Sequence, residues 1–438
     1  MRRRSRWVAA LAAVALFGVA GCSAAGSNTS DAGRTNIVFW SWVPGIDKSV
    51  DLWNKTHSNI HVELQDTPAG SSGTYAKMFS AVRGGRGGPD VAQVEYQQLP
   101  AFVLENGLAD LGPLGMNQRK SEFVDWQLAQ TTFDGRAYAV PQASGPMALY
   151  YRADVFTDLG LSAPTTWDEY AADAAKIHAS SPNRYISTFP PGNSAWFTAL
   201  AWQAGAQWFK VDDGTWTVDV ASPTTLKVAK YWDDLREKGL IDTIPDFSNG
   251  WYSDLQKGNI VAWPSAQWGG SLLSGNAPGT KGDWAVAPLP QWNDDGEQTS
   301  ANWGGSATAV FRDSQHKQAA ADFALWLNTD KDSIDLLVKG GYGWPATKGA
   351  LDGTTLDAPD PFLAGQQNAN RDVFEKADAS INTDWQWSPT TTNTYAHLND
   401  AFAAAVAGNG TFVDAVKQTQ RETVADLKAK GLKVRNGS

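Results

Sequence analysis

The chain has 438 residues, 19% of them charged, and its formal net charge is −10. This length exceeds one ordinary domain and suits two lobes that each bury a core. The negative charge disfavours nucleic acid and anionic lipid headgroups as partners, because both repel an acidic surface. A single cysteine, Cys22, excludes an internal disulfide, so stability must come from core burial.

The N-terminus has the layout of a secretory signal peptide. Four arginines fall within the first six residues, Val8–Phe17 is uninterruptedly apolar, and small residues follow. Val19–Cys22 resembles a bacterial lipobox, in which the cysteine is lipidated and becomes residue one of the mature protein. The alternatives are an ordinary signal peptide beside a free thiol, and a membrane span, for which the apolar stretch is too short. We expect cleavage after 1–21 and lipidation of Cys22.

A flexible tether is expected next, over 22–35, because Ser, Ala, Gly, Asn and Thr dominate it. Removing the first 21 residues removes four arginines and no acidic residue, so the net charge changes from −10 to −14. Strand patterns at 36–40, 60–64 and 91–94 then alternate with helical patterns at 47–55 and 75–82. This alternation predicts an α/β fold with a mainly parallel sheet.

The second half continues in the same way. Thr166 is followed three residues later by Glu169, which predicts a capping box for a helix at 166–180. Asp212–Gly214 predicts a hairpin turn between strands at 209–211 and 216–218. The remaining expected elements are helices at 196–204, 223–238, 317–327, 397–407 and 411–430, and strands at 137–141, 149–151, 260–263 and 307–311.

Patterns of catalytic and metal sites are absent from the sequence. The five histidines lack metal-ligand spacing, Gly84–Gly88 lacks the Lys-Ser/Thr of a phosphate loop, and 293–296 lacks the downstream spacing of an EF-hand. We expect no metal and no cofactor. A glycosidase needs only two carboxylates, and Glu95 with Asp384 is the pair to test. No local pattern supports that role, so we expect a protein that is not an enzyme.

Aromatic and polar residues occur together in several predicted loops. Saccharides present C–H faces and hydroxyl edges, so their sites need flat aromatic walls beside carboxylates and amides. Core packing is as good an explanation for any one tryptophan, but convergence of several on a cleft is favoured for the set. The set is Trp40–Trp42, Glu95–Tyr96, Trp196–Phe197, Trp263–Trp268, Trp303–Gly305, Tyr342–Trp344 and Asp384–Trp387.

Ordered motifs give the chain a resemblance to the extracellular solute-binding proteins, family 1, of ABC importers, in the maltodextrin-binding branch. The most specific stretch is Asp134–Phe156, DGRAYAVPQASGPMALYYRADVF. Arg152 stands there in place of the usual Asn. The other motifs are Pro89–Val94, Pro164–Tyr170, Lys281–Pro290 and Gly304–Leu327.

The resemblance implies a two-lobed α/β fold, periplasmic-binding-protein-like of type II, with hinge crossovers and sugar in the cleft. The N-terminal lobe would comprise 36–143 and 304–342, and the C-terminal lobe 144–303 and 343–438. Crossovers are expected at 141–149, 300–306 and 342–344. The branch's carboxylate is missing at Ser144 and Gly145, which argues against maltose itself. The expected ligand-binding residues are Trp42, Glu95, Tyr96, Ser144, Gly145, Trp196, Trp268, Trp303, Gly304, Gly305, Trp344 and either Trp385 or Trp387.

These expectations combine into one functional hypothesis. The protein would be a monomeric, lipid-anchored receptor on the extracytoplasmic face of the cell membrane. It would bind a di- or oligosaccharide and deliver it to the permease subunits of an ABC importer. The alternatives are a secreted hydrolase of polysaccharides and a receptor for a non-sugar solute such as a glycerophosphodiester or a peptide.

Overall fold

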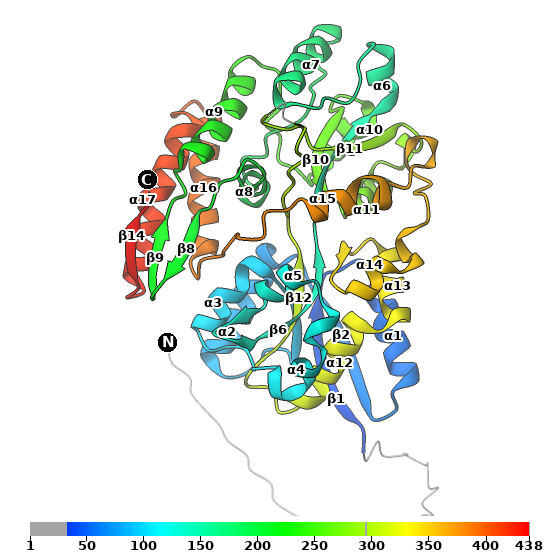
Figure 1. Cartoon of the computed structure of the whole chain (residues 1–438), viewed down its shortest axis with the longest axis vertical. Helices are drawn as coiled ribbons and strands as arrows, with labels where there is room; N and C mark the ends of the chain where they lie inside the picture. The colour runs from blue at the N-terminus through cyan, green and yellow to red at the C-terminus, as the bar shows by residue number, and fades with distance from the viewer. Residues whose placement is uncertain (1–32, 294–295, 438) are drawn as a thin grey trace, which may run out of the picture.

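The computed structural model describes residues 33–293 and 296–437. Within these ranges no helix combines the length and apolar character that a membrane crossing requires. The expected signal peptide, Cys22 and most of the tether lie outside the described residues. Figure 1 shows two lobes, called here the lower and the upper lobe after their places in that view, joined by extended segments.

The lower lobe contains a six-stranded sheet. Its strands are β1 (Thr35–Ser41), β2 (Ile60–Asp66), β3 (Val91–Glu95), β6 (Ala139–Ser144), β12 (Ser306–Val310) and β13 (Trp344–Pro345). Their order is β13-β6-β12-β3-β1-β2, with β1 parallel to β2 and β3, and β12 antiparallel to β3 and β6. The strands expected from the sequence in this lobe are confirmed. The expected mainly parallel sheet is wrong, because β12 returns from the upper lobe antiparallel to β3 and β6, and β13 is also antiparallel to β6. Because β1 and β3 are parallel, their carboxyl ends bring Trp42 and Glu95 to the same edge of the sheet.

Helices cover both faces of this sheet. One face packs against α1 and α12 through Phe39, Trp53 and Phe323, and the other packs against α2 and α3 through Met78 and Phe102. The helices of the lower lobe are α1 (Ile46–Thr56), α2 (Thr74–Gly84), α3 (Leu99–Leu104), α4 (Asn117–Arg119), α5 (Asp125–Gln130), α12 (Lys317–Thr329), α13 (Lys331–Gly340) and α14 (Lys348–Asp352). Burial on both faces gives the sheet the three-layer arrangement of an α/β fold.

The upper lobe contains a three-stranded antiparallel sheet in the order β10-β7-β11. It is formed by β7 (Met147–Arg152), β10 (Ala262–Ala266) and β11 (Trp284–Pro288). β10 begins two residues after the expected start at 260 and contains Pro264, which an edge strand tolerates because one side needs no ladder hydrogen bond.

The helices of the upper lobe are α6 (Ala153–Asp158), α7 (Trp167–Ser180), α8 (Ser194–Gln203), α9 (Pro223–Glu237), α10 (Asn249–Lys257), α11 (Gly269–Asn276), α15 (Glu375–Ala379), α16 (Thr391–Val406) and α17 (Phe412–Ala429). The five helices expected from the sequence in the upper lobe are present, one of them with a wrong start, and four further helices, α6, α10, α11 and α15, were not expected. The capping box of Thr166 and Glu169 is present. The expected start of α16 at 397 is wrong: the helix begins at Thr391, because burial of Thr391 and Thr394 overrides the weak helix propensity of threonine.

A third small sheet lies at the edge of the upper lobe. β8 (Phe209–Asp212) and β9 (Thr215–Val218) form the expected hairpin, with Asp213 and Gly214 both at positive φ. β14 (Lys433–Asn436), which was not expected from the sequence, pairs in parallel with β9.

Tryptophan dominates the core of the upper lobe. Trp232 is fully buried, and its ring lies 4.9 Å from that of Trp196 and 5.8 Å from that of Trp167. Eight tryptophans of this core are among the largest fully buried side chains: Trp167, Trp196, Trp202, Trp208, Trp232, Trp251, Trp284 and, from β13 at the junction, Trp344. The high tryptophan content therefore serves mainly to fill the upper lobe.

Replacing Trp232 by Ala should lower the free energy of unfolding by about 3–5 kcal/mol, because the substitution leaves a large cavity in a packed core. Urea unfolding followed by circular dichroism measures this loss. The matched control is Val211→Ala on the exposed face of β8, which should change the free energy by less than about 0.5 kcal/mol. A loss below about 1 kcal/mol for Trp232→Ala would contradict this packing.

Candidate functional site: the crossovers between the lobes

Three segments, 144–146, 302–305 and 341–344, lie where the chain passes between the lobes, and hydrogen bonds join the first two. The Gly145 N–H donates to Asn302 Oδ1 at 2.6 Å, and the Trp303 N–H donates to the Gly145 carbonyl at 2.9 Å. The Asn302 amide in turn donates to the Gly304 carbonyl at 2.7 Å. The third segment joins through β13, where Trp344 pairs with Ser144. The crossovers therefore form one connected structure.

Glycine is required where these segments approach one another. A Cβ atom on Gly145 would lie 2.1 Å from the Trp303 carbonyl oxygen, a distance that the backbone cannot accommodate. Gly305 has φ +87°, and a Cβ atom there would lie 3.0 Å from the Tyr96 ring. The expected site residues Gly145, Gly304 and Gly305 thus shape the crossovers through their missing side chains.

Trp268 and Trp303 form an aromatic wall on the upper-lobe side. Their ring centroids are 4.6 Å apart, and the Trp268 indole N–H donates to the Trp303 carbonyl at 3.0 Å. Trp303 is buried, whereas Trp268 is partly exposed. Of this pair, Trp268 is therefore the ring with a surface available to a ligand.

Phe247 extends this wall, and the sequence analysis missed it. Its ring stacks on Trp303 at 6.1 Å, 40% of the residue is exposed, and its backbone has φ +58°. A bulky residue in this conformation is strained, and such strain is concentrated at functional sites. A lone Phe in a loop shows no periodicity, so no sequence pattern could have found it.

A buried carboxylate holds the loop that carries Phe247. Asp246 accepts a hydrogen bond from the Asn193 amide at 2.6 Å, and burial raises the pKa of this carboxyl to about 7. Asn193 also caps α8, since its side chain accepts from the Trp196 N–H. The loop is thereby fixed to the start of a core helix.

Trp202, Trp385 and Trp387 form a second aromatic cluster. Trp385 stacks on Trp202 at 4.7 Å, and Trp387 meets Trp385 edge-on at 5.4 Å. Trp385 is buried, whereas Trp387 is partly exposed and packs against the cores of both lobes. Of the two positions expected from the sequence, Trp387 therefore has the accessible ring.

The lower lobe contributes Trp42, Tyr75 and Glu95. Trp42, partly exposed, meets the Tyr75 ring edge-on at 5.7 Å. The Tyr75 hydroxyl donates to Glu95 Oε2 at 2.9 Å, and burial raises the pKa of the Glu95 carboxyl. An aromatic face and a carboxylate thus lie together at the carboxyl end of the parallel strands, where α/β folds bind ligands.

A buried polar chain leads from this edge to the crossovers. The Tyr96 hydroxyl donates to Gln127 Oε1 at 3.2 Å, and the Gln127 amide donates to Ser144 Oγ at 3.2 Å. Burial holds the pKa of Tyr96 well above its ordinary value, so this chain stays neutral. The expected residues Tyr96 and Ser144 are both fully buried, and they position neighbouring groups.

The two remaining expected residues, Trp196 and Trp344, are both fully buried. Trp196 is 1% exposed, and its indole N–H donates to the Pro264 carbonyl at 2.9 Å, as a core residue would. Trp344 is also fully buried, at the crossover itself. Ligand contact by any of these residues stays a prediction.

Hydrogen bonds also connect the lobes away from the crossovers. Thr392 Oγ1, at the start of α16, donates to Gln98 Oε1 at 2.7 Å. The Gln130 amide of α5 donates to the Trp385 carbonyl at 3.3 Å. The segment that carries Trp385 and Trp387 therefore contacts the lower lobe.

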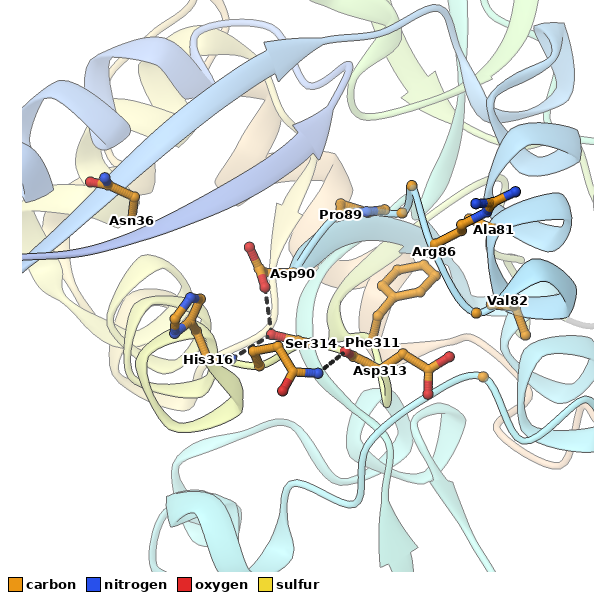
Figure 2. A pocket seen from close by; sticks show the side chains of 15 residues that line it. Asn36, Ala81, Val82, Arg86, Pro89, Asp90, Phe311, Asp313, Ser314 and His316 are labelled. Carbon is orange, nitrogen blue, oxygen red and sulfur yellow. Dashed lines mark hydrogen bonds between the residues drawn. The ribbon is translucent and has the colours of Figure 1, made fainter.

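A cavity of about 320 Å³ lies far from these residues, at the opposite end of the strands of the lower lobe. Figure 2 shows Asp90 and Ser314 joined by a hydrogen bond of 2.5 Å within it. The second Asp90 oxygen accepts from the Val38 N–H at 2.9 Å. Both oxygens of this carboxylate thus have partners, so Asp90 serves the local structure.

The comparisons identify the family. The model of the bacterial extracellular solute-binding proteins matches residues 40–334, and the chain belongs to this family. An arabinooligosaccharide-binding protein of Bacillus subtilis is 23% identical over 415 residues, 92% of each chain. A lactose-binding protein of Rhizobium radiobacter is 25% identical over 56% of this chain and 58% of its own. Both relatives are named for the sugars that they bind.

Solved structures agree with this assignment. An ABC transporter associated binding protein from B. animalis subsp. lactis, in complex with β-1,6-galactobiose, is 27% identical with a TM-score of 0.83. The galacto-N-biose-/lacto-N-biose I-binding protein from Bifidobacterium longum is 26% identical with a TM-score of 0.82. Both alignments cover 92% of this chain. They cover 100% of the B. animalis protein and 99% of the B. longum protein. The chain therefore has the two-lobed α/β fold of the periplasmic sugar-binding proteins, type II.

Replacing Gly145 by Ala should lower the free energy of unfolding by about 2 kcal/mol or more, because the new Cβ atom would displace the Trp303 carbonyl. The control is Gly192→Ala, where a Cβ atom meets open space. Thermal unfolding of both variants measures the difference. Equal melting temperatures would show that the two crossovers are not packed as described.

Proposed function

We propose that the protein is a lipid-anchored receptor that binds a di- or oligosaccharide between its lobes and delivers it to the permease of an ABC importer. The observation that carries the proposal is the placement of partly exposed aromatic rings at the junction of the lobes. Trp268 and Phe247 come from the upper lobe, Trp42 from the lower lobe, and Trp387 packs against both cores.

The chemistry of these residues suits a neutral sugar. Aromatic faces pack against the C–H faces of a pyranose or furanose ring, and Glu95 accepts hydrogen bonds from hydroxyl groups. One monosaccharide is too small to pack on several separate aromatic rings at once, which supports a ligand of two or more sugar units. The named ligands of the relatives, arabino-oligosaccharides, lactose and β-1,6-galactobiose, are consistent with this size.

Transport requires that the sugar bind one arrangement of the lobes better than another. A ligand held by rings of both lobes satisfies this condition, since the second contact forms only when the lobes approach. The hydrogen-bonded crossovers would act as the hinge. We place the lower lobe at 36–143 together with 304–352, because β13 and α14 extend it beyond the expected residue 342. Lipidation of Cys22 would keep both lobes near the permease.

Isothermal titration against arabinotriose, lactose, β-1,6-galactobiose, lacto-N-biose and maltose tests the proposal. We expect at least one disaccharide or trisaccharide to bind with a micromolar or lower Kd. Glycerophosphocholine and a tripeptide serve as non-sugar controls. Binding of either control without any sugar, or release of monosaccharide during incubation, would overturn the proposal.

Trp268→Ala should weaken binding of the best sugar in that panel by about tenfold or more, because a stacking ring is lost. Trp196→Ala is the matched comparison, since this ring is buried in the core. It should chiefly lower the melting temperature. Titration and thermal unfolding of both variants distinguish these outcomes. Unchanged affinity in Trp268→Ala would remove Trp268 from the site.

A further inference from the structure

Asp378 is a carboxylate at the junction of the lobes with one oxygen atom that has no partner. It lies in α15, which Figure 1 shows on the side of the upper lobe that faces the lower lobe. Its Oδ1 atom is buried from solvent and forms no hydrogen bond with any residue of 33–293 and 296–437. An unpaired acceptor in such a place is costly, because it has lost its hydration without compensation.

Neutral groups of the lower lobe surround this carboxylate. The Trp344 indole of β13 and the Ser144 hydroxyl of β6 face the carboxylate and lower its pKa, but neither forms a hydrogen bond of ordinary geometry with it. The Trp344 indole N–H also lacks a hydrogen-bond partner among the described residues. Tyr96 of that lobe interacts electrostatically with Asp378, and burial holds the pKa of Tyr96 well above its ordinary value, so Tyr96 is neutral.

No cation compensates Asp378 in the part of the chain that the structure describes. Arg371, in the turn before α15, pairs with Asp357 and Glu375. Arg152, at the end of the neighbouring strand β7, pairs with Asp154 and Asp283. Glu375 and Lys376 of α15 itself are exposed, and Tyr150 of β7 is held neutral by burial.

Burial therefore raises the pKa of the Asp378 carboxyl to about 7, against the opposing effect of Trp344 and Ser144. Near neutral pH this group can gain or lose a proton at little cost. Hydrogen bonds donated to its ionised form would lower the pKa again. A saccharide supplies such donors in pairs, because its hydroxyl groups lie on adjacent carbon atoms.

We propose that Asp378 is a ligand-binding carboxylate, which accepts hydrogen bonds from a hydroxyl pair of the bound saccharide while the Trp344 indole donates to a neighbouring sugar oxygen. This inference rests on the proposed function and deepens it, since it assigns a polar anchor to the crossover, where Ser144 and Gly145 provide no charge. The aromatic walls then fix the plane of the sugar, and Asp378 fixes its rotation in that plane.

The sign of the pH effect follows from this arrangement. Only the ionised carboxylate accepts both hydroxyl bonds, so binding should release a proton and strengthen as the pH rises through 7. The folding stability of the sugar-free protein changes with pH in the opposite direction. Because the folded state holds this proton more tightly than the unfolded chain, its stability should fall between about pH 4 and pH 7.

The test is titration of lactose and β-1,6-galactobiose into wild type, Asp378→Asn and Asp372→Asn at pH 5.5 and pH 8. Asp372→Asn is the matched control, because Asp372 is exposed in the turn before α15. For a sugar that wild type binds, affinity should be about tenfold higher at pH 8 than at pH 5.5. Asp378→Asn should lose about tenfold at pH 8 and most of the pH gradient, whereas Asp372→Asn should match wild type. Glu95 and Asp246 are common to all three proteins, so the differences isolate Asp378.

A second measurement follows the proton directly. Titration in two buffers of different ionisation enthalpy at pH 7 should show release of about half a proton more per sugar bound by wild type than by Asp378→Asn, since Asp246 is common to both proteins. Equal proton release by the two proteins, or unchanged affinity and pH gradient in folded Asp378→Asn, overturns the role of Asp378 and leaves the receptor function intact. Failure of wild type to bind either sugar or any other sugar of the panel overturns both.

Discussion

The hydrogen bonds among Gly145, Asn302 and Trp303 are the constraint on which the rest of the site depends. They connect two crossovers that are 157 residues apart in sequence, and they do so through backbone atoms and one amide side chain. Trp303 in turn accepts the hydrogen bond that orients Trp268 and provides the face on which Phe247 stacks. The path of the backbone between the lobes and the position of the aromatic wall are therefore set by the same few atoms.

The tryptophans divide into two populations with different physical roles. Most fill the upper lobe, whose sheet has only three strands and needs large side chains to build a core around it. A minority remain partly exposed, and two of these lie against buried members of the first group: Trp268 on Trp303, and Trp387 on Trp385. A rigid aromatic core thus supports the accessible rings, which reduces the conformational entropy lost when a ligand packs on them.

Much of the fold was predictable because its signals are local. Strands such as β1 and β3 are short apolar runs, the start of α7 is marked by Thr166 and Glu169, and the β8–β9 turn contains Asp213 and Gly214. The site was only partly predictable, because the sequence shows where aromatic residues occur and gives no information on which are covered. Trp196 and Trp268 look equivalent as sequence, yet only the second has an accessible ring. Phe247 and Asp378 matter through a strained backbone and an unpaired oxygen, and neither property leaves a pattern in the chain.

The parallel pairing of β14 with β9 has a consequence for the behaviour of the protein in concentrated solution. β9 lies between β8 and β14, so the last strand of the chain occupies hydrogen-bonding groups that would otherwise form a free edge. Free edges of this kind recruit strands from other molecules and promote aggregation. β14 is then itself the edge strand, and its exposed Lys433 and Arg435 place charge there, which disfavours pairing with another molecule. Removal of β14 would expose the less protected edge of β9 and promote self-association.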